Sequence, residues 1–65
     1  MIRSNVKKIM EDKGVTIRGM FMKTGLADMT ILRARRHQIT QCRLSTLETI
    51  AQCLECKVKD LFDEE

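Results

Sequence analysis

The stretch TIRGMFMKTGLADMTILRARR, residues 16–36, decides the fold. Its first half predicts a short helix, because Thr16 can accept a hydrogen bond from an amide of the first turn and apolar residues follow at helical spacing. These apolar residues are Ile17, Met20 and Phe21. Gly25 tolerates the positive φ of a tight turn and ends this helix. The pattern therefore predicts a helix that stops at a turn in the middle of the stretch.

The second half of the stretch predicts another short helix, from Asp28 to about Arg36. The side chains expected to face the core are Leu26, Ile31 and Ala34. Those expected to project outward are Asp28, Met29, Leu32, Arg33 and Arg36. An outward face that carries Met29 and Leu32 is unusual for a helix that meets only water.

The N-terminal part and the segment after the stretch are assigned from the same periodicity. A helix is expected over about residues 2–12, with Gly14 just past its end. Its apolar face consists of Ile2, Val6, Ile9 and Met10. Residues 37–43, HQITQCR, have no helical period and predict a polar loop with Ile39 as its apolar anchor.

Two further helices are expected in the C-terminal third. One begins at Leu44 or Ser45, where Ser45 and Glu48 have the spacing of a capping box. Its apolar face consists of Leu47, Ile50, Ala51 and Leu54. A short last helix over about residues 57–62 brings together Val58, Leu61 and Phe62, which either close the core or form a surface for a partner. The fold class predicted is all-α, with five short helices.

Length and composition agree with a small helical domain. A chain of 65 residues has room for one core, so we expect residues 1–65 to form a single domain, with residues 63–65 as a flexible acidic end. Apolar residues make up 43% of the chain, and it contains no proline and three glycines. This composition argues against disorder and against a turn-rich β fold.

The net charge of +3 hides an asymmetry along the chain. Residues 14–43 carry six cations against one anion, whereas residues 44–65 carry two cations against six anions. A basic middle beside an acidic end suggests a polyanionic partner for the middle of the chain, although a solvated charged face would show the same pattern.

The opening MIRSNVKKIM contains no long apolar run, so we expect neither a signal peptide nor a membrane span, and a cytoplasmic location. The three cysteines cannot all pair within one chain, and in a reducing compartment they stay thiols. Cys53 and Cys56, with Cys42 and His37, are zinc-ligand types, but their spacing is poor for a site. We expect no metal and no cofactor.

Residues 16–36, together with LSTLETIAQCLECKVKDLF at residues 44–62, resemble the Xre family of lambdoid phage repressors and Cro-like regulators. The specific features are Gly25 followed by Leu26, the inward Ile31 and Ala34, and the segment LSTLETIAQCL. The resemblance implies a lambda-repressor-like helix-turn-helix fold and a DNA-binding transcription regulator of a bacterium or phage, associated with the nucleoid. Two such helices cross at about 90–120°, so the second can enter a major groove about 12 Å wide.

The chain departs from the family pattern at two positions. Phe21 stands where members usually have a small residue, so it must alter the contact between the two helices or swing aside. Ala27 stands where a serine or threonine commonly caps the second helix. Asp28 can take over that cap if the helix starts one residue later.

Carried over by position, the resemblance implies base contacts by four residues, namely Asp28, Met29, Leu32 and Arg33. A guanidinium such as that of Arg33 matches guanine O6 and N7 bidentately, although it could instead be a surface charge. Met29 and Leu32 can pack against a thymine methyl group, or else belong to the core or a protein interface. Asp28 accepts a hydrogen bond from cytosine N4, or else caps the helix.

The resemblance further implies phosphate contacts at both ends of the motif. The residues are Thr16 and Arg18 at the start of the first helix, and Arg36, Gln38, Gln41 and Arg43 after the second. Lys23 and Arg35 are weaker candidates, and His37 is a phosphate neighbour or a loop residue. Such regulators commonly bind as twofold dimers to half-sites about 34 Å apart.

The functional prediction is a repressor that occupies a palindromic operator on double-stranded DNA as a homodimer. The expected dimer surface is the last helix and its surroundings. An enzyme is not expected, because the chain has one histidine, no glycine-rich phosphate loop and no room for a substrate cleft. The alternative is a protein-interaction module on the same domain, such as an antitoxin or an anti-repressor.

Overall fold

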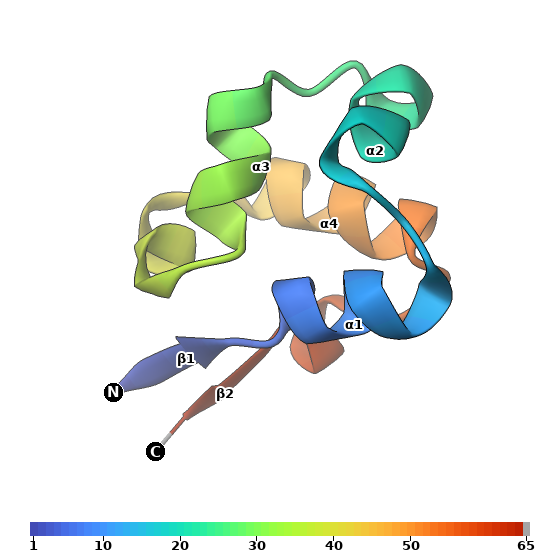
Figure 1. Ribbon diagram of the computed structural model, residues 1–65. Coiled ribbons are helices and arrows are strands. Elements are labelled where there is room, and N and C mark those ends of the chain that lie inside the picture. The colour runs from blue at the N-terminus through green and yellow to red at the C-terminus, as the bar shows by residue number, and fades with distance from the viewer. Residues whose placement is uncertain (65) are drawn as a thin grey trace.

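Helix α4 (Leu44–Cys53) runs behind the other three helices (Figure 1). The computed structural model describes residues 1–64. In front of α4 lie α1 (Val6–Lys13), α2 (Ile17–Thr24) and α3 (Asp28–Ala34). Two short 3-10 helices, η1 (His37–Gln41) and η2 (Val58–Leu61), follow α3 and α4. The all-α class is confirmed, although two of the expected helical segments differ in type or extent.

The core draws its side chains from every helix. Its buried members are Val6, Met10, Met20, Ile31, Ala34, Ile39, Leu47, Ile50, Ala51, Leu54 and Leu61. The four residues predicted to line α4 are all among them, and so are Ile31 and Ala34 of α3. Ile39 is buried as well, which confirms it as the anchor of the segment after α3.

The N-terminal helix begins later than predicted, because residues 2–4 form a strand. Strand β1 (Ile2–Ser4) pairs antiparallel with β2 (Phe62–Glu64), and the two ends of the chain lie side by side (Figure 1). The amide of Asn5 donates to the Leu61 carbonyl at 2.8 Å, and the amide of Val6 donates to the Ser4 hydroxyl at 3.2 Å. The C-terminal segment thus supplies backbone partners for residues 2–5, the Ser4 hydroxyl accepts from the Val6 amide, and α1 starts only at Val6.

The C-terminal end is arranged differently from the prediction as well. The last helix, expected over residues 57–62, is the single 3-10 turn η2, and Phe62 continues into β2. Asp63 and Glu64, expected in a flexible acidic end, lie opposite Arg3 and Ile2 in the sheet, whereas Glu65 lies outside the described residues. The carboxylate of Asp63 accepts a hydrogen bond from Asn5 Nδ2 at 2.9 Å.

The predicted capping box at the start of α4 is wrong. The helix begins at Leu44, with Arg43 in the N-cap position, and no side chain caps it. Ser45 therefore lies inside the first turn and not in the N-cap position, and its carbonyl accepts from Thr49 Oγ1 at 3.0 Å. The segment expected as a loop at residues 37–43 contains η1 instead of irregular backbone.

No helix within residues 1–64 is long and apolar enough to cross a lipid bilayer.

Candidate DNA interface

Local hydrogen bonds fix the turn between α2 and α3. As predicted, Thr16 caps α2, and its hydroxyl accepts from the amide of Gly19 at 2.9 Å. Gly25 ends α2 with φ of 75°, and its amide donates to the Phe21 carbonyl at 2.8 Å. The Thr24 hydroxyl donates to the Met20 carbonyl at 2.7 Å and accepts from the Leu26 amide at 3.1 Å. These bonds fix the direction in which α3 leaves α2.

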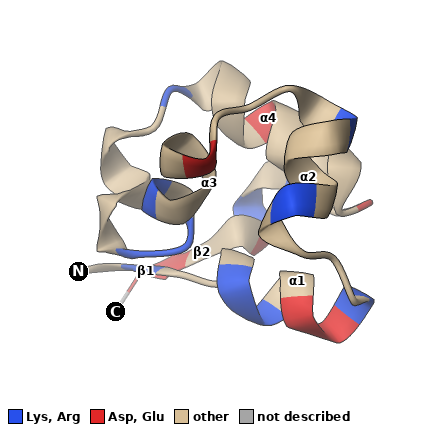
Figure 2. Cartoon of the chain, turned by 45° about the horizontal axis from the view of Figure 1, so that its top comes forward, with Lys and Arg blue, Asp and Glu red and all other residues tan. Residues whose placement is uncertain are grey.

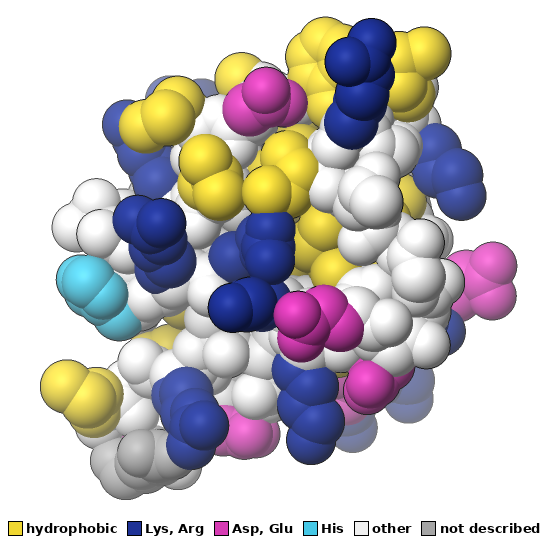
Figure 3. Space-filling model, viewed as in Figure 1, with side chains coloured by type: hydrophobic (Ala, Val, Ile, Leu, Met, Phe, Trp, Pro, Cys, Tyr) yellow, Lys and Arg dark blue, Asp and Glu magenta, His cyan; other side chains and the backbone are white. Residues whose placement is uncertain are grey.

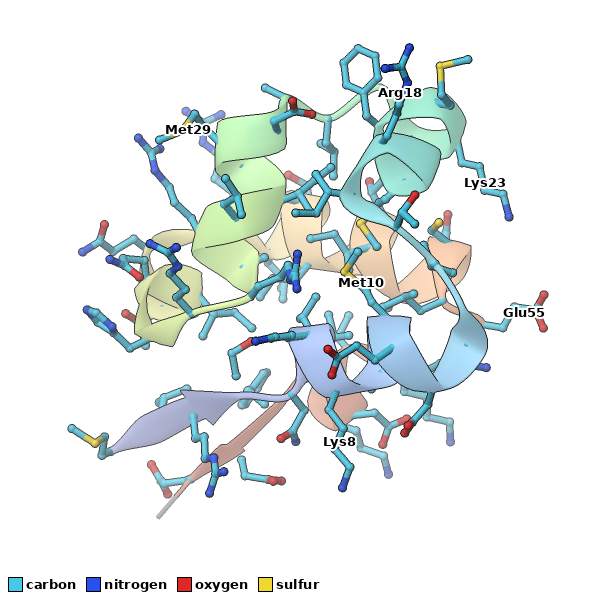
Figure 4. The ribbon with its side chains drawn as sticks, in the orientation of Figure 1. Lys8, Met10, Arg18, Lys23, Met29 and Glu55 are labelled. Carbon is cyan, nitrogen blue, oxygen red and sulfur yellow. The ribbon has the colours of Figure 1, made fainter. Side chains whose placement is uncertain are left out.

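Helix α3 presents one face to the core and the opposite face to solvent. Ile31 and Ala34 are fully buried, whereas 61% of Met29 is exposed and Arg33 is exposed as well. Leu32 lies between these extremes and is half-buried. Met29 projects outward from α3, in contrast to Met10, which points into the core (Figure 4). The outward set predicted from the sequence is therefore accessible to a partner.

Asp28 does not cap α3. The N-cap position belongs to Ala27, which provides no side-chain hydrogen bond, and Asp28 is the first residue of the helix with an exposed side chain. Its carboxylate still lies at the positive end of the helix dipole, which stabilises a negative charge there. Asp28 is five residues from Arg33, so the two side chains do not share a face of the helix.

A hollow of about 510 Å³ brings two groups of predicted residues together. One group is Met29, Leu32 and Arg33 on α3, and the other is Arg36, Gln38 and Gln41 in the following segment. His37 also contributes to the lining. Lys and Arg side chains gather beside the His, cyan, at the left of Figure 3. The residues expected to read bases and those expected to bind phosphates after α3 therefore share one concave surface.

A second hollow, of about 660 Å³, lies between α2 and the start of α3. It is lined by Ile17, Arg18, Phe21, Met22, Ala27, Asp28 and Met29. Met29 belongs to both hollows, so the two form a continuous surface along α3. Arg18 projects outward from α2 (Figure 4). Thr16 and Arg43 are exposed but line neither hollow.

Cations lie on both helices of this surface, but they also occur elsewhere. Helix α2 carries Arg18 and Lys23 and no acidic residue, whereas α3 carries Asp28 as well as Arg33 (Figure 2). Helix α1, outside this surface, carries three Lys residues and two acidic residues. Gln38 is half-buried, and its Oε1 is buried without a hydrogen-bond partner. This leaves its amide nitrogen as the group that can donate to a phosphate.

Phe21 is the residue whose place the periodicity predicts wrongly. Its spacing from Ile17 predicts an inward side chain, but 43% of Phe21 is exposed, and Met20 beside it is fully buried. Met22 is 74% exposed, so α2 ends in an apolar surface that was not predicted. The sequence signal for this placement is that Phe21 stands where family members usually have a small residue. In the structure Phe21 is turned aside and lines the second hollow.

The cysteines do not form a metal site within residues 1–64. Cys42, Cys53 and Cys56 are free thiols, and no three His, Cys, Asp or Glu side chains of this part of the chain are placed to hold a metal ion. Burial raises the pKa of the Cys42 thiol, although the nearby Arg33 charge lowers it. Burial and the charge of Asp60 raise the pKa of Cys56, against a smaller opposing effect of Lys13.

The arrangement of a capped helix, a glycine turn and an outward α3 agrees with the comparison of the sequence with protein families. The model of the Cro/C1-type HTH DNA-binding domain matches residues 5–65. The chain belongs to this family. The Cro/C1-type HTH domain is a DNA-binding domain, and double-stranded DNA is its partner, which confirms the predicted family and class of partner. The comparison with curated proteins gives no significant match.

Proposed function

We propose that this Cro/C1-type domain is a sequence-specific transcription regulator that binds a palindromic operator as a homodimer and represses by excluding polymerase. The observation that carries the proposal is the hollow shared by Arg33 and Arg36. A helix face that reads bases needs cations beside it, because phosphates flank the groove on both sides. Residues 1–65 act in this proposal as a single DNA-binding domain.

Arg33 is assigned to a guanine, because it is exposed on the outward face of α3 and its guanidinium can donate to O6 and N7 together. Met29 and Leu32 flank it in the same hollow and provide apolar surface for thymine methyl groups. Asp28 is exposed at the start of the helix and can accept from cytosine N4.

The phosphate contacts are divided between the two ends of the surface. Arg36, Gln38 and Gln41 hold the backbone on the side of η1. Thr16 and Arg18 hold it at the N-terminus of α2, where free amides and the helix dipole favour an anion. Arg43, which follows η1 in the chain, extends the first group. These contacts orient α3 in the groove without reading sequence.

The test selects binding sites for the wild type and for Arg33→Ala from a pool of randomised duplexes, followed by titration at several salt concentrations. We expect a palindromic site, and Arg33→Ala should lose about 1–3 kcal/mol of discrimination at one base position in each half-site. Arg36→Ala should instead weaken binding to all sequences and reduce the slope of log affinity against log salt by about 0.9.

Lys8→Ala is the matched control. It removes a cation from α1, at the opposite end of the molecule from Met29 and Arg18 in Figure 4, and should leave both the preferred site and the salt slope unchanged. If no sequence is enriched, and Arg33→Ala and Lys8→Ala bind alike, the assignment of α3 as the reading helix is wrong. The protein-interaction alternative then replaces it.

A further inference from the structure

The hollow of about 660 Å³ between α2 and the start of α3 gathers exposed apolar side chains. Within residues 1–64, five large apolar side chains are exposed. Three of them, Phe21, Met22 and Met29, line this hollow, whereas Met1 and Leu44 do not. Figure 3 shows apolar side chains on both sides of a Lys or Arg at the top of the view, over α2. Such a concentration of exposed apolar side chains is typical of a surface that binds a partner.

This hollow continues into the surface assigned to DNA. Met29 lines both hollows and projects outward from α3 (Figure 4). Asp28, which the proposed function assigns to a base edge, lines the second hollow as well, and so does Arg18, which it assigns to a phosphate. A duplex that contacts Arg18, Asp28 and Met29 together also covers the hollow that they share with Phe21. This continuity favours DNA as the occupant.

The bases of a duplex have one group that fits an apolar hollow. Hydrogen-bond donors and acceptors line the base edges in the major groove, and the C5 methyl group of thymine is the apolar exception. A phosphate fits less well, because five of the seven residues that line the hollow are apolar and the carboxylate of Asp28 repels an anion. A cytosine methylated at C5 presents the same methyl group in the same groove.

We propose that this hollow binds the C5 methyl group of a pyrimidine, in contact with Phe21 of α2 and Met29 of α3. The inference rests on the proposed function, because it needs α3 in the major groove. It deepens that function, since it makes Phe21 a residue that determines specificity. Helix α2 then reads sequence in addition to contacting phosphates through Thr16 and Arg18.

Asp28 determines which base edge suits the place beside the methyl group. Its ionised carboxylate only accepts hydrogen bonds, so it favours an amino group such as cytosine N4 and disfavours the O4 atom of thymine. A thymine in contact with Phe21 is therefore a neighbour of the base that Asp28 contacts. A 5-methylcytosine, in contrast, supplies the methyl group and the amino group from one base.

The test measures the affinity of the whole chain for the duplex that the selection from randomised duplexes enriches. Each thymine of this duplex is replaced in turn by deoxyuridine, which lacks only the methyl group, and each cytosine by 5-methylcytosine, which gains it. At one position of each half-site, the wild type should bind the methylated base about fourfold more tightly, as expected for the burial of one methyl group. Phe21→Ala should reduce this ratio to about one.

A comparison of thymine with 5-methylcytosine at that position identifies the source of the methyl group. Tighter binding of 5-methylcytosine indicates a modified cytosine, and tighter binding of thymine indicates an unmodified site. Either order supports the proposal, provided that the ratio to the unmethylated base depends on Phe21. Leu32 lines the other hollow, so a methyl effect that Leu32→Ala removes should fall at a different position.

Leu44→Ala is the matched control, because Leu44 is 64% exposed and lines neither hollow. It should keep the fourfold ratio. Phe21→Leu retains apolar bulk and should keep part of the ratio. Circular dichroism checks that the variants fold, and a ratio of two affinities does not change with the fraction of active protein.

Two results overturn the proposal. One is a wild type that does not distinguish methylated from unmethylated pyrimidines at any position, or does so with a ratio that Phe21→Ala leaves unchanged. The other is an equal loss of affinity of Phe21→Ala for the thymine and deoxyuridine duplexes, which places the ring on deoxyribose carbons. A selection that enriches no duplex contradicts the proposed function and this inference with it, whereas an enriched site without the methyl effect contradicts the inference alone.

Discussion

Helices α4 and α2 are of similar length but differ in how far their side chains are buried. In α4, Leu47, Ile50 and Ala51 are buried, and Leu54 at its end is buried as well. In α2, only Met20 is buried. The adjacent Phe21 and Met22 expose much of their apolar surface. The buried apolar surface that stabilises the fold is therefore concentrated in α4, while α2 and the outward face of α3 leave their side chains available to a partner.

The two helices also differ in how their ends are held. An N-cap side chain and a glycine hold α2, and both act through hydrogen bonds within a few residues. No side chain caps the start of α4, and a non-glycine residue in a left-handed conformation ends it. A helix with little burial depends on its caps, whereas one with much burial tolerates poor ones. Substitutions at Ile50, Thr16 and Glu55 test these differences in burial and in capping.

The largest effect is expected from Ile50→Ala. It removes fully buried side-chain volume from the centre of α4 and should lower the free energy of unfolding by about 2–5 kcal/mol. A domain of this size has only a few kcal/mol to lose, so the variant should be partly unfolded at 37 °C. Urea unfolding followed by circular dichroism measures the change.

Met22→Ala provides the matched control for Ile50→Ala. It shortens an apolar side chain of similar size on α2, where 74% of the residue is already exposed, and should change stability by less than about 0.5 kcal/mol. If both substitutions had the same cost, the contrast between a buried α4 and an exposed α2 would be wrong.

A smaller effect is expected from Thr16→Ala, which removes the hydrogen bond to the Gly19 amide at 2.9 Å. The loss of an N-cap should lower stability by about 0.5–2 kcal/mol, and it should increase hydrogen exchange at the first amides of α2. Thr16→Ser keeps the acceptor oxygen and should behave like the wild type. Equal exchange in both variants would show that tertiary packing, not the cap, holds the start of α2.

The features that sequence reasoning predicts well are those determined within a few residues. Thr16 as a cap, Gly25 as a turn and the buried face around Ile50 depend on local hydrogen bonds and on periodicity. The fold class and the outward face of α3 follow from them. The outward positions of α3 could be assigned for the same reason, since an outward position on a helix is a local property, while the contacts of these residues with DNA stay a prediction.

The features that sequence reasoning missed depend on contacts between distant parts of the chain. Strand β1 forms because β2, at the other end of the chain, supplies its backbone partners, and three residues carry no pattern that shows this. Periodicity predicts both Met20 and Phe21 inward, but Met20 is fully buried whereas 43% of Phe21 is exposed. That Arg33 and Arg36 share a hollow, while Arg43 lies outside it, depends on how η1 packs against α3.

The smallest effect tests the C-terminal end of α4. Glu55 has φ of 56°, while the Cys56 amide donates to the Ala51 carbonyl at 2.9 Å, which is a helix end that favours glycine. Glu55→Gly should raise the free energy of unfolding by up to about 1 kcal/mol, because glycine adopts this conformation without the clash of a Cβ atom. Gln52→Gly, on the exposed side of α4, should lower it by about 1 kcal/mol. If Glu55→Gly raises the free energy of unfolding and Gln52→Gly lowers it, the end of α4 is strained and is held by the packing around it. If both substitutions lower the free energy of unfolding, the left-handed conformation of Glu55 is not strained.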